Sequence, residues 1–186
     1  MNGRKLLFLD LETTGLDPTR HEIIEAAWRL TSPDGREVLL ERVEKLLPQR
    51  IESADPEALR LNGYQPALWR KEECISEEQL AGSFLQVSKD AVLAGHGLHF
   101  DESFIRVLLT RLGLLPNWHY QTIDTQKLAW PLLMAGQVES VSLGTVAQYF
   151  RLPCQPWPHR ALADVDLTHR VFLAEIDLYG RAIPAV

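Results

Sequence analysis

The sequence predicts an α/β fold with a mixed five-stranded sheet. Three short apolar runs separated by turns open the chain, and further apolar runs then alternate with amphipathic segments of helical period. The first pattern is typical of an antiparallel meander, and the second is typical of parallel strands joined by helices. We therefore expect parallel strands beside the first strand of the meander, which becomes central, and helices on both faces of the sheet.

The elements of the first half follow from local signals. A Ser-Pro-Asp-Gly turn at residues 32–35 separates the second and third strands, and Asp55 and Pro56 are suited to a helix cap and a first helical position. The Ser-Glu-Glu-Gln sequence at residues 76–79 has the form of a capping box. We expect strands over residues 6–12, 23–30 and 38–43, and helices over residues 55–61 and 76–89.

The second half alternates short strands with helices. Gly113 ends one amphipathic helix, Pro131 interrupts another, and Ser142 caps a third. An alanine-rich stretch closes the fold as a long helix. We expect strands over residues 91–96 and 120–125, helices over residues 100–112, 127–134, 142–150 and 160–178, and a proline-rich loop over residues 152–158.

Length and charge set broad limits on function. At 186 residues the chain is long enough for a substantial core, and we expect a single domain over residues 1–186. The 19 basic and 25 acidic residues give a net charge of −6, which provides no overall attraction to nucleic acid or acidic membranes. Metal ions and a local basic rim can still hold a phosphate backbone. Candidates for such a rim are Arg106, Arg111, Lys127, Arg151 and Arg160.

Cysteine use and hydrophobicity predict a cytoplasmic protein. Cys74 and Cys154 are far apart in the chain and in no metal-ligand spacing, so we expect reduced thiols. Asp10 ends the first apolar run well short of a signal-peptide core, and no stretch approaches transmembrane length. We therefore expect a cytoplasmic location and no membrane partner.

Two acids lie inside the first apolar strand. Asp10 and Glu12 are two residues apart, and residues two apart in an extended chain point to the same face. Buried neighbouring carboxylates repel each other and lose solvation, so they need a strong positive partner, and a divalent cation can serve both. The alternative is a surface strand with alternating acids, and the continuous apolar neighbours argue against it.

Three later residues fall where the predicted sheet brings them toward this pair. Asp101 follows the fourth strand at the start of a helix, and Asp164 lies among small apolar residues in the first turns of the last helix. An acid early in a helix is often only a favourable dipole partner. His159 lies in the preceding loop or first turn, where a histidine can accept a proton near neutral pH, the alternative being an exposed loop residue.

Taken together, three motifs resemble those of the DEDDh, or DnaQ-like, 3′-5′ exonuclease family. They are Asp10-x-Glu12-Thr13-Thr14-Gly15, His96-x-x-x-Phe100-Asp101 and His159-x-Ala161-x-x-Asp164. Their order and spacing both match, and the resemblance covers residues 5–173. It implies a ribonuclease-H-like fold, two magnesium or manganese ions, and removal of nucleotides one at a time from a 3′ end.

The resemblance also implies roles for individual residues. Asp10, Glu12 and Asp164 would bind the ion that activates water, and Asp10 with Asp101 would hold the second ion. His159 would be the general base. The residues expected to line the pocket of the terminal nucleotide are Thr13, Thr14, Leu16, His96 and Phe104, with core packing as the alternative for Leu16 and Phe104.

One position departs from the family pattern. Family members commonly have asparagine after the histidine of the middle motif, and this chain has Gly97 there. The change removes no metal ligand and no base. We therefore expect activity to survive, with the contact to the terminal sugar or base loosened and substrate preference open to change.

The sequence leaves the substrate and partners open. We favour DNA with a single-stranded or frayed 3′ end as the substrate. The alternative is an exoribonuclease that trims RNA 3′ ends. A free-standing trimming or repair enzyme is mildly favoured over a proofreading subunit, because little sequence follows the last helix to bind a polymerase. The sequence also leaves open whether the protein forms a homodimer. A phosphatase with Asp10 as nucleophile and a non-catalytic polymerase-binding module explain the residue set less well.

Overall fold

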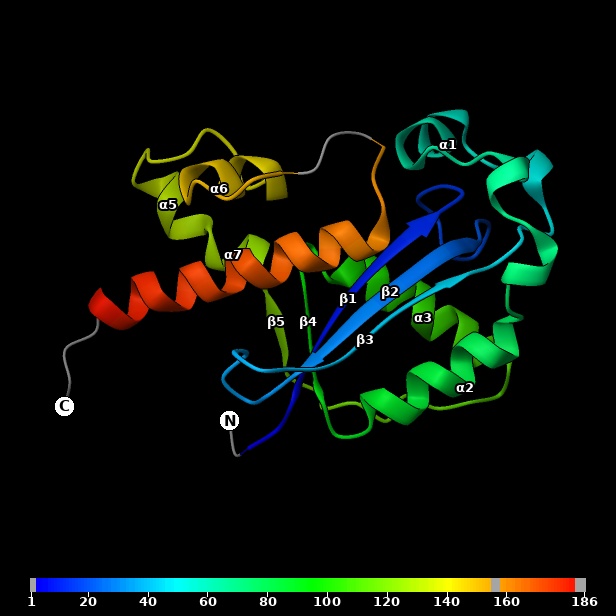
Figure 1. The fold of residues 1–186 in the computed structure, drawn as a ribbon, viewed down its shortest axis with the longest axis horizontal. Helices are drawn as coiled ribbons and strands as arrows, with labels where there is room; N and C mark the ends of the chain where they lie inside the picture. Colours follow the sequence, from blue (N-terminus) through cyan, green and yellow to red (C-terminus); the bar gives the residue numbers. More distant parts are fainter. Residues whose placement is uncertain (1–2, 155–157, 183–186) are drawn as a thin grey trace.

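A computed structural model describes residues 3–154 and 158–182, so residues 155–157 of the predicted proline-rich loop lie outside the described residues. Five strands of the described chain form one sheet in the order β3-β2-β1-β4-β5 (Figure 1). The strands β1 (Leu6–Thr13), β2 (Ile23–Thr31) and β3 (Val38–Lys45) are antiparallel, and β4 (Val92–Gly95) and β5 (Thr122–Asp124) add parallel strands on the other side of β1. The predicted mixed sheet with a central first strand is confirmed.

Helices cover both faces of the sheet, as Figure 1 shows. Alternate side chains of β1 point to opposite faces. Leu7, Leu9 and Leu11 pack with α2 (Glu77–Ser88) and α3 (His99–Arg111). Leu6 and Phe8 pack instead with α7 (Ala161–Ala182). The same alternation turns Asp10 and Glu12 toward α7.

The shorter helices complete the fold around this sandwich. α1 (Pro56–Asn62) begins with the Asp55 side chain accepting a hydrogen bond from the Glu57 amide, and it ends at Gly63, whose φ of 63° suits glycine. α4 (Thr125–Leu128), α5 (Trp130–Met134) and α6 (Leu143–Tyr149) follow β5, and residues of this region pack against α7. Short 3-10 turns cover Ile51–Ser53, Pro66–Leu68 and Lys71–Glu73.

Two predicted elements differ from the structure. The strand expected over residues 120–125 is shorter, because the Asp124 side chain accepts a hydrogen bond from the Gln126 amide and starts α4. The helix expected over residues 127–134 is two helices that meet at Ala129. Pro131 lies at the beginning of the second, where its missing amide hydrogen leaves no hydrogen bond unmade.

The remaining predictions agree closely with the observed elements. Ser76 and Gln79 form the reciprocal hydrogen bonds of a capping box at the start of α2, and Ser142 caps α6. The last helix extends to Ala182. No helix within the described ranges has both the length and the apolar character needed to cross a bilayer.

The aromatic stack around Phe84 gives a direct test of the core. Phe84 is fully buried, and its ring centroid lies 5.7 Å from that of Trp28 and 5.8 Å from that of Trp118. We expect Phe84→Ala to lower the free energy of unfolding by about 3–5 kcal/mol, because it removes this packing and leaves a cavity. Tyr120→Ala, which truncates an exposed ring, is the control and should change stability by less than about 0.5 kcal/mol. Urea unfolding of both variants measures the difference, and a loss below about 1 kcal/mol for Phe84→Ala would contradict this account.

Candidate active site

Three carboxylates converge where the second half of β1 meets the start of α7. Carboxylate oxygens of Asp10, Glu12 and Asp164 lie within 4.8 Å of one another. Asp10 and Glu12 share one face of β1, and Asp164 projects from the first turn of the helix that covers that face. The structure therefore brings together three of the four acids that the sequence proposed as metal ligands.

The fourth acid, Asp101, approaches from the edge of β1. β4 pairs with β1 only at Leu6–Phe8, so the backbone amide of Leu11 has no strand partner on that side. The Asp101 carboxylate accepts a hydrogen bond from this amide at 2.9 Å. Asp101 is 4% exposed and lines the same cleft as the three clustered acids. Its placement at the first turn of α3 matches the sequence prediction.

Burial and like charge dominate the electrostatics of these acids. Burial, and then the neighbouring carboxylates of Asp101, Asp164 and Glu12, raise the pKa of Asp10 well above its ordinary value. Burial is also the main reason that the pKa of Glu12 rises to about 8 and that of Asp101 to about 8. Carboxylates held in this way either keep protons at neutral pH or bind a cation. An all-oxygen donor set suits a hard divalent ion such as Mg²⁺ or Mn²⁺.

His159 lies beside the acidic cluster. Its Nδ1 atom is 3.0 Å from Oδ2 of Asp164, and its backbone amide donates a hydrogen bond to the Leu61 carbonyl. The side chain is 56% exposed, so the ring faces the cleft and solvent rather than the core. Nδ1–H can donate to Asp164, which leaves the Nε2 lone pair available to accept a proton.

The sequence reasoning missed an ion pair that supports this cluster. Glu25 is 1% exposed and lies opposite Glu12 in the β1–β2 pairing. The guanidinium group of Arg160 donates to both carboxylate oxygens of Glu25 and lies 5.0 Å from the ring centroid of Trp69. The signal for Glu25 was the one used for Asp10, an acid inside an apolar strand. Its ion pair with Arg160 could be identified only from the three-dimensional structure.

The acids and His159 line one cleft of about 490 Å³. Of the residues expected to contact a terminal nucleotide, His96 is in this wall. Its Nε2–H donates to the Val141 carbonyl at 2.9 Å, and its Nδ1 then accepts from the Thr125 hydroxyl at 2.8 Å. Burial lowers the pKa of His96, which favours this neutral, fixed ring. Gly97, which the sequence analysis associated with the terminal sugar or base, also lines the cleft. The lining residues that the sequence reasoning did not assign to the site are Leu11, Leu61, Phe100 and Gln126.

Thr13 and Thr14, which were expected to line the pocket of the terminal nucleotide, are not among the described residues that line the cleft. Both side chains are buried, and their hydroxyl groups hold the turn itself. Thr13 Oγ1 donates to the Gly15 carbonyl at 2.7 Å, and Thr14 Oγ1 accepts from the Glu22 amide at 2.9 Å. Leu16 is 75% exposed on the same turn, which excludes the core-packing alternative for that residue.

Phe104, for which a pocket wall and core packing were both open, lies in the core. It is 3% exposed and belongs to the core between α3 and the sheet, so its core-packing alternative holds. Phe100, one helical turn earlier, lines the cleft, and its ring centroid lies 5.0 Å from that of Phe104. Phe104 therefore supports the aromatic wall from behind.

The proposed basic rim is largely engaged in ion pairs with the protein's own acids. Arg106 pairs with Glu102 at 2.6 Å, and Lys127 pairs with Asp124 at 3.4 Å. Arg111 likewise pairs with Glu77. None of the five proposed rim residues is among the described residues that line the cleft.

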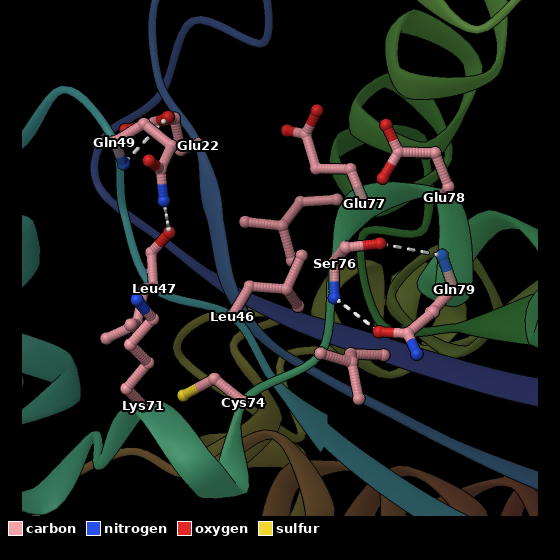
Figure 2. Close-up of a pocket in the computed structure, with 12 residues that line it drawn as sticks. Glu22, Leu46, Leu47, Gln49, Lys71, Cys74, Ser76, Glu77, Glu78 and Gln79 are labelled. Atoms are coloured by element: carbon pink, nitrogen blue, oxygen red, sulfur yellow. Dashed lines mark hydrogen bonds between the residues drawn. The ribbon is translucent and has the colours of Figure 1, made fainter.

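A second hollow, of about 500 Å³, lies at the beginning of α2 (Figure 2). Its polar groups serve the protein itself. The Glu22 carboxylate accepts hydrogen bonds from the amides of Gln49 and Arg50, and Figure 2 shows the reciprocal bonds of Ser76 and Gln79. Within the described residues, the group of acids able to hold a metal ion lies in the first cleft.

Comparison with known proteins agrees with this geometry. The exonuclease family RNase_T matches residues 7–172. A DNA polymerase III of the PolC type from Thermotoga maritima is 31% identical over 91% of this chain, and an oligoribonuclease from Corynebacterium diphtheriae is 29% identical over 96% of it. The chain spans only 12% of the polymerase but 82% of the oligoribonuclease.

The fold has close structural neighbours as well. The structure of E. coli exonuclease I in complex with a dT13 oligonucleotide superposes with a TM-score of 0.82 at 19% identity, covering 96% of this chain and 42% of that one. This likeness confirms the predicted ribonuclease-H-like fold. Because the family match covers most of the sequence, the chain belongs to the exonuclease family RNase_T, among the DnaQ-like 3′-5′ exonucleases that its three motifs resemble.

Proposed function

We propose that this chain is an active exonuclease domain, formed by residues 1–186, that releases nucleoside monophosphates from the 3′ end of nucleic acid. The observation that carries the proposal is the meeting of Asp10, Glu12 and Asp164 in one cleft with His159. A binding module has no need for buried acids that repel one another, whereas phosphodiester hydrolysis needs such a cation site.

Two divalent ions, Mg²⁺ or Mn²⁺, would be held by Asp10, Glu12, Asp101 and Asp164. When bound, such ions stabilise negative charge on the attacking and leaving oxygens at phosphorus. The raised pKa values of Asp10, Glu12 and Asp101 support this assignment, because a bound cation replaces the protons that these buried groups otherwise keep. Glu25 already has a positive partner in Arg160.

His159 is proposed as the general base. Its contact with Asp164 fixes the ring and the tautomer, and Nε2 then takes a proton from the attacking water. The exposed position of the ring lets solvent carry the proton away after each turnover. Leu16, exposed on the turn after β1, is proposed to contact the terminal nucleotide.

Single-stranded DNA is the proposed substrate. The protein would act on it either as a free-standing enzyme or in association with a polymerase. The PolC-type relative supports a link to DNA, although its match covers a small part of that protein. Short RNA is the second candidate, because the oligoribonuclease from Corynebacterium diphtheriae matches over 82% of its own length.

Substitution of the two central residues tests the activity. We expect Asp10→Asn to abolish release of the 3′-terminal nucleotide and His159→Ala to slow it by about 10²–10⁴-fold, since one removes a metal ligand and the other the base. His119→Ala is the matched control and should keep full activity. The measurement follows 3′-labelled and 5′-labelled oligonucleotides with Mn²⁺ and with chelator. Full-length oligonucleotide that persists with pure, metal-supplied wild-type protein would sink the proposal.

Thermal stability provides a test of the cation site that does not depend on activity. The pKa of Glu12 is raised from 4.5 to about 8 in the folded protein, so the folded state binds more protons than the unfolded state between these values. In the presence of a chelator, the free energy of unfolding should therefore fall as pH rises from about 5 to 8. Added Mn²⁺ should raise Tm at both pH values, and the rise at pH 8 should exceed the rise at pH 5 by at least about 2 °C.

Two variants complete the stability test. Glu12→Gln should weaken both the pH dependence and the response to Mn²⁺, because it removes one of the buried acids. Glu139→Gln, at an exposed position, should leave both unchanged. Equal Mn²⁺ responses in the two variants would contradict the metal assignment.

Substrate class is decided by comparing single-stranded DNA, duplex DNA with a mismatched 3′ end, and RNA of two to five nucleotides. We expect the highest kcat/KM on single-stranded DNA. A higher value on short RNA would replace the first candidate with the second.

A further inference from the structure

Gly97 leaves part of the cleft wall without a side chain. Its φ is +71°, a left-handed conformation that glycine adopts without strain and asparagine tolerates. A Cβ atom at this position would lie 3.8 Å from Oε1 and 3.9 Å from Nε2 of Gln126. The carboxamide group of Gln126 therefore lies beside the space into which a side chain of residue 97 would extend.

One carboxylate fixes the two residues against each other. Oδ1 of Asp124 accepts a hydrogen bond from the Gly97 amide at 2.9 Å and another from the Gln126 amide at 3.0 Å. Gly95 pairs with Asp124 where β4 and β5 run side by side (Figure 1). The position of Gln126 is thus set by the sheet and by the first turn of α4, and it does not depend on a free loop.

The carboxamide of Gln126 is available to a ligand. It is half-buried in the wall of the acidic cleft, and no described residue forms a hydrogen bond with its side chain. A carboxamide offers two donors and an acceptor in one plane. The other polar groups of the cleft are carboxylates and histidines, so Gln126 is suited to the uncharged donors and acceptors of a sugar or a base.

We infer that Gln126 binds the sugar or base of the 3′-terminal nucleotide and takes the place of the side chain that residue 97 lacks. The inference rests on the proposed exonuclease function, because it assumes that the scissile phosphate lies at the carboxylate cluster. A nucleotide placed there extends its sugar and base along the cleft walls, where Gln126 and Phe100 lie.

A swap of the two side chains tests this assignment. Gln126→Ala should raise KM for oligonucleotide about 3- to 10-fold with little change in kcat, because it removes hydrogen bonds made in the ground state and the transition state alike. Gly97→Asn combined with Gln126→Ala should restore KM to within about twofold of wild type. The conformation and the ordinary contact distance at residue 97 both accept asparagine. Gln121→Ala, at an exposed position outside the cleft, is the control.

Binding of a deoxynucleoside 5′-monophosphate, measured by calorimetry with Mn²⁺, separates this inference from the proposed function. We expect the same 3- to 10-fold loss of affinity in Gln126→Ala and its recovery in the double variant. Wild-type hydrolysis with unchanged KM and Kd in Gln126→Ala would overturn the inference and leave the proposed function standing. If nucleotide binding depends on Gln126 but the protein does not hydrolyse oligonucleotides, the proposed function is overturned and the role of Gln126 in nucleotide binding stands.

Discussion

The central constraint on this protein is that Asp10 and Glu12 lie on a buried strand among like charges. Burial and the neighbouring carboxylates raise the pKa of both residues, so the arrangement disfavours their ionised forms. Apolar packing on both faces of β1 holds the strand in place against this cost. The packing of β1 therefore holds the two acids side by side, and a bound cation would offset their mutual repulsion.

The elements around β1 each combine a structural and a positional role. α7 buries one face of the sheet and delivers Asp164, while α3 buries the other face and delivers Asp101 to the Leu11 amide. α1 closes the remaining side, because Asn62 donates to the Thr13 carbonyl and the Leu61 carbonyl accepts from the His159 amide. A shift of any one of these helices therefore moves a proposed metal ligand or the proposed base as well as a packing surface.

Sequence reasoning succeeded where a short-range pattern decides the outcome. The capping box at Ser76 and the spacing of Asp10 and Glu12 are local, and each of the three motifs spans only about six residues. It failed where the outcome depends on how elements meet. Phe100 and Phe104 are one turn apart on α3, and which ring reaches the cleft depends on how that helix packs on the sheet. Gln126 reaches the cleft through the β4–β5 register and Asp124, which no local pattern contains.

The composition of the cleft also determines how nucleic acid is held. Among its described lining residues the charged groups are four carboxylates, and the arginines nearby are paired with the protein's own acids. Without a cation these carboxyl groups, whether protonated or ionised, offer a phosphate backbone no positive charge. Under the proposed function, substrate affinity, and not only turnover, therefore depends on the metal ions. Apart from the ions, such a cleft offers few groups that can bind the phosphate backbone. Selectivity must then come from neutral contacts with the terminal sugar and base. Gly97, Phe100 and Gln126 line the same cleft as the four acids and are the proposed site of these neutral contacts.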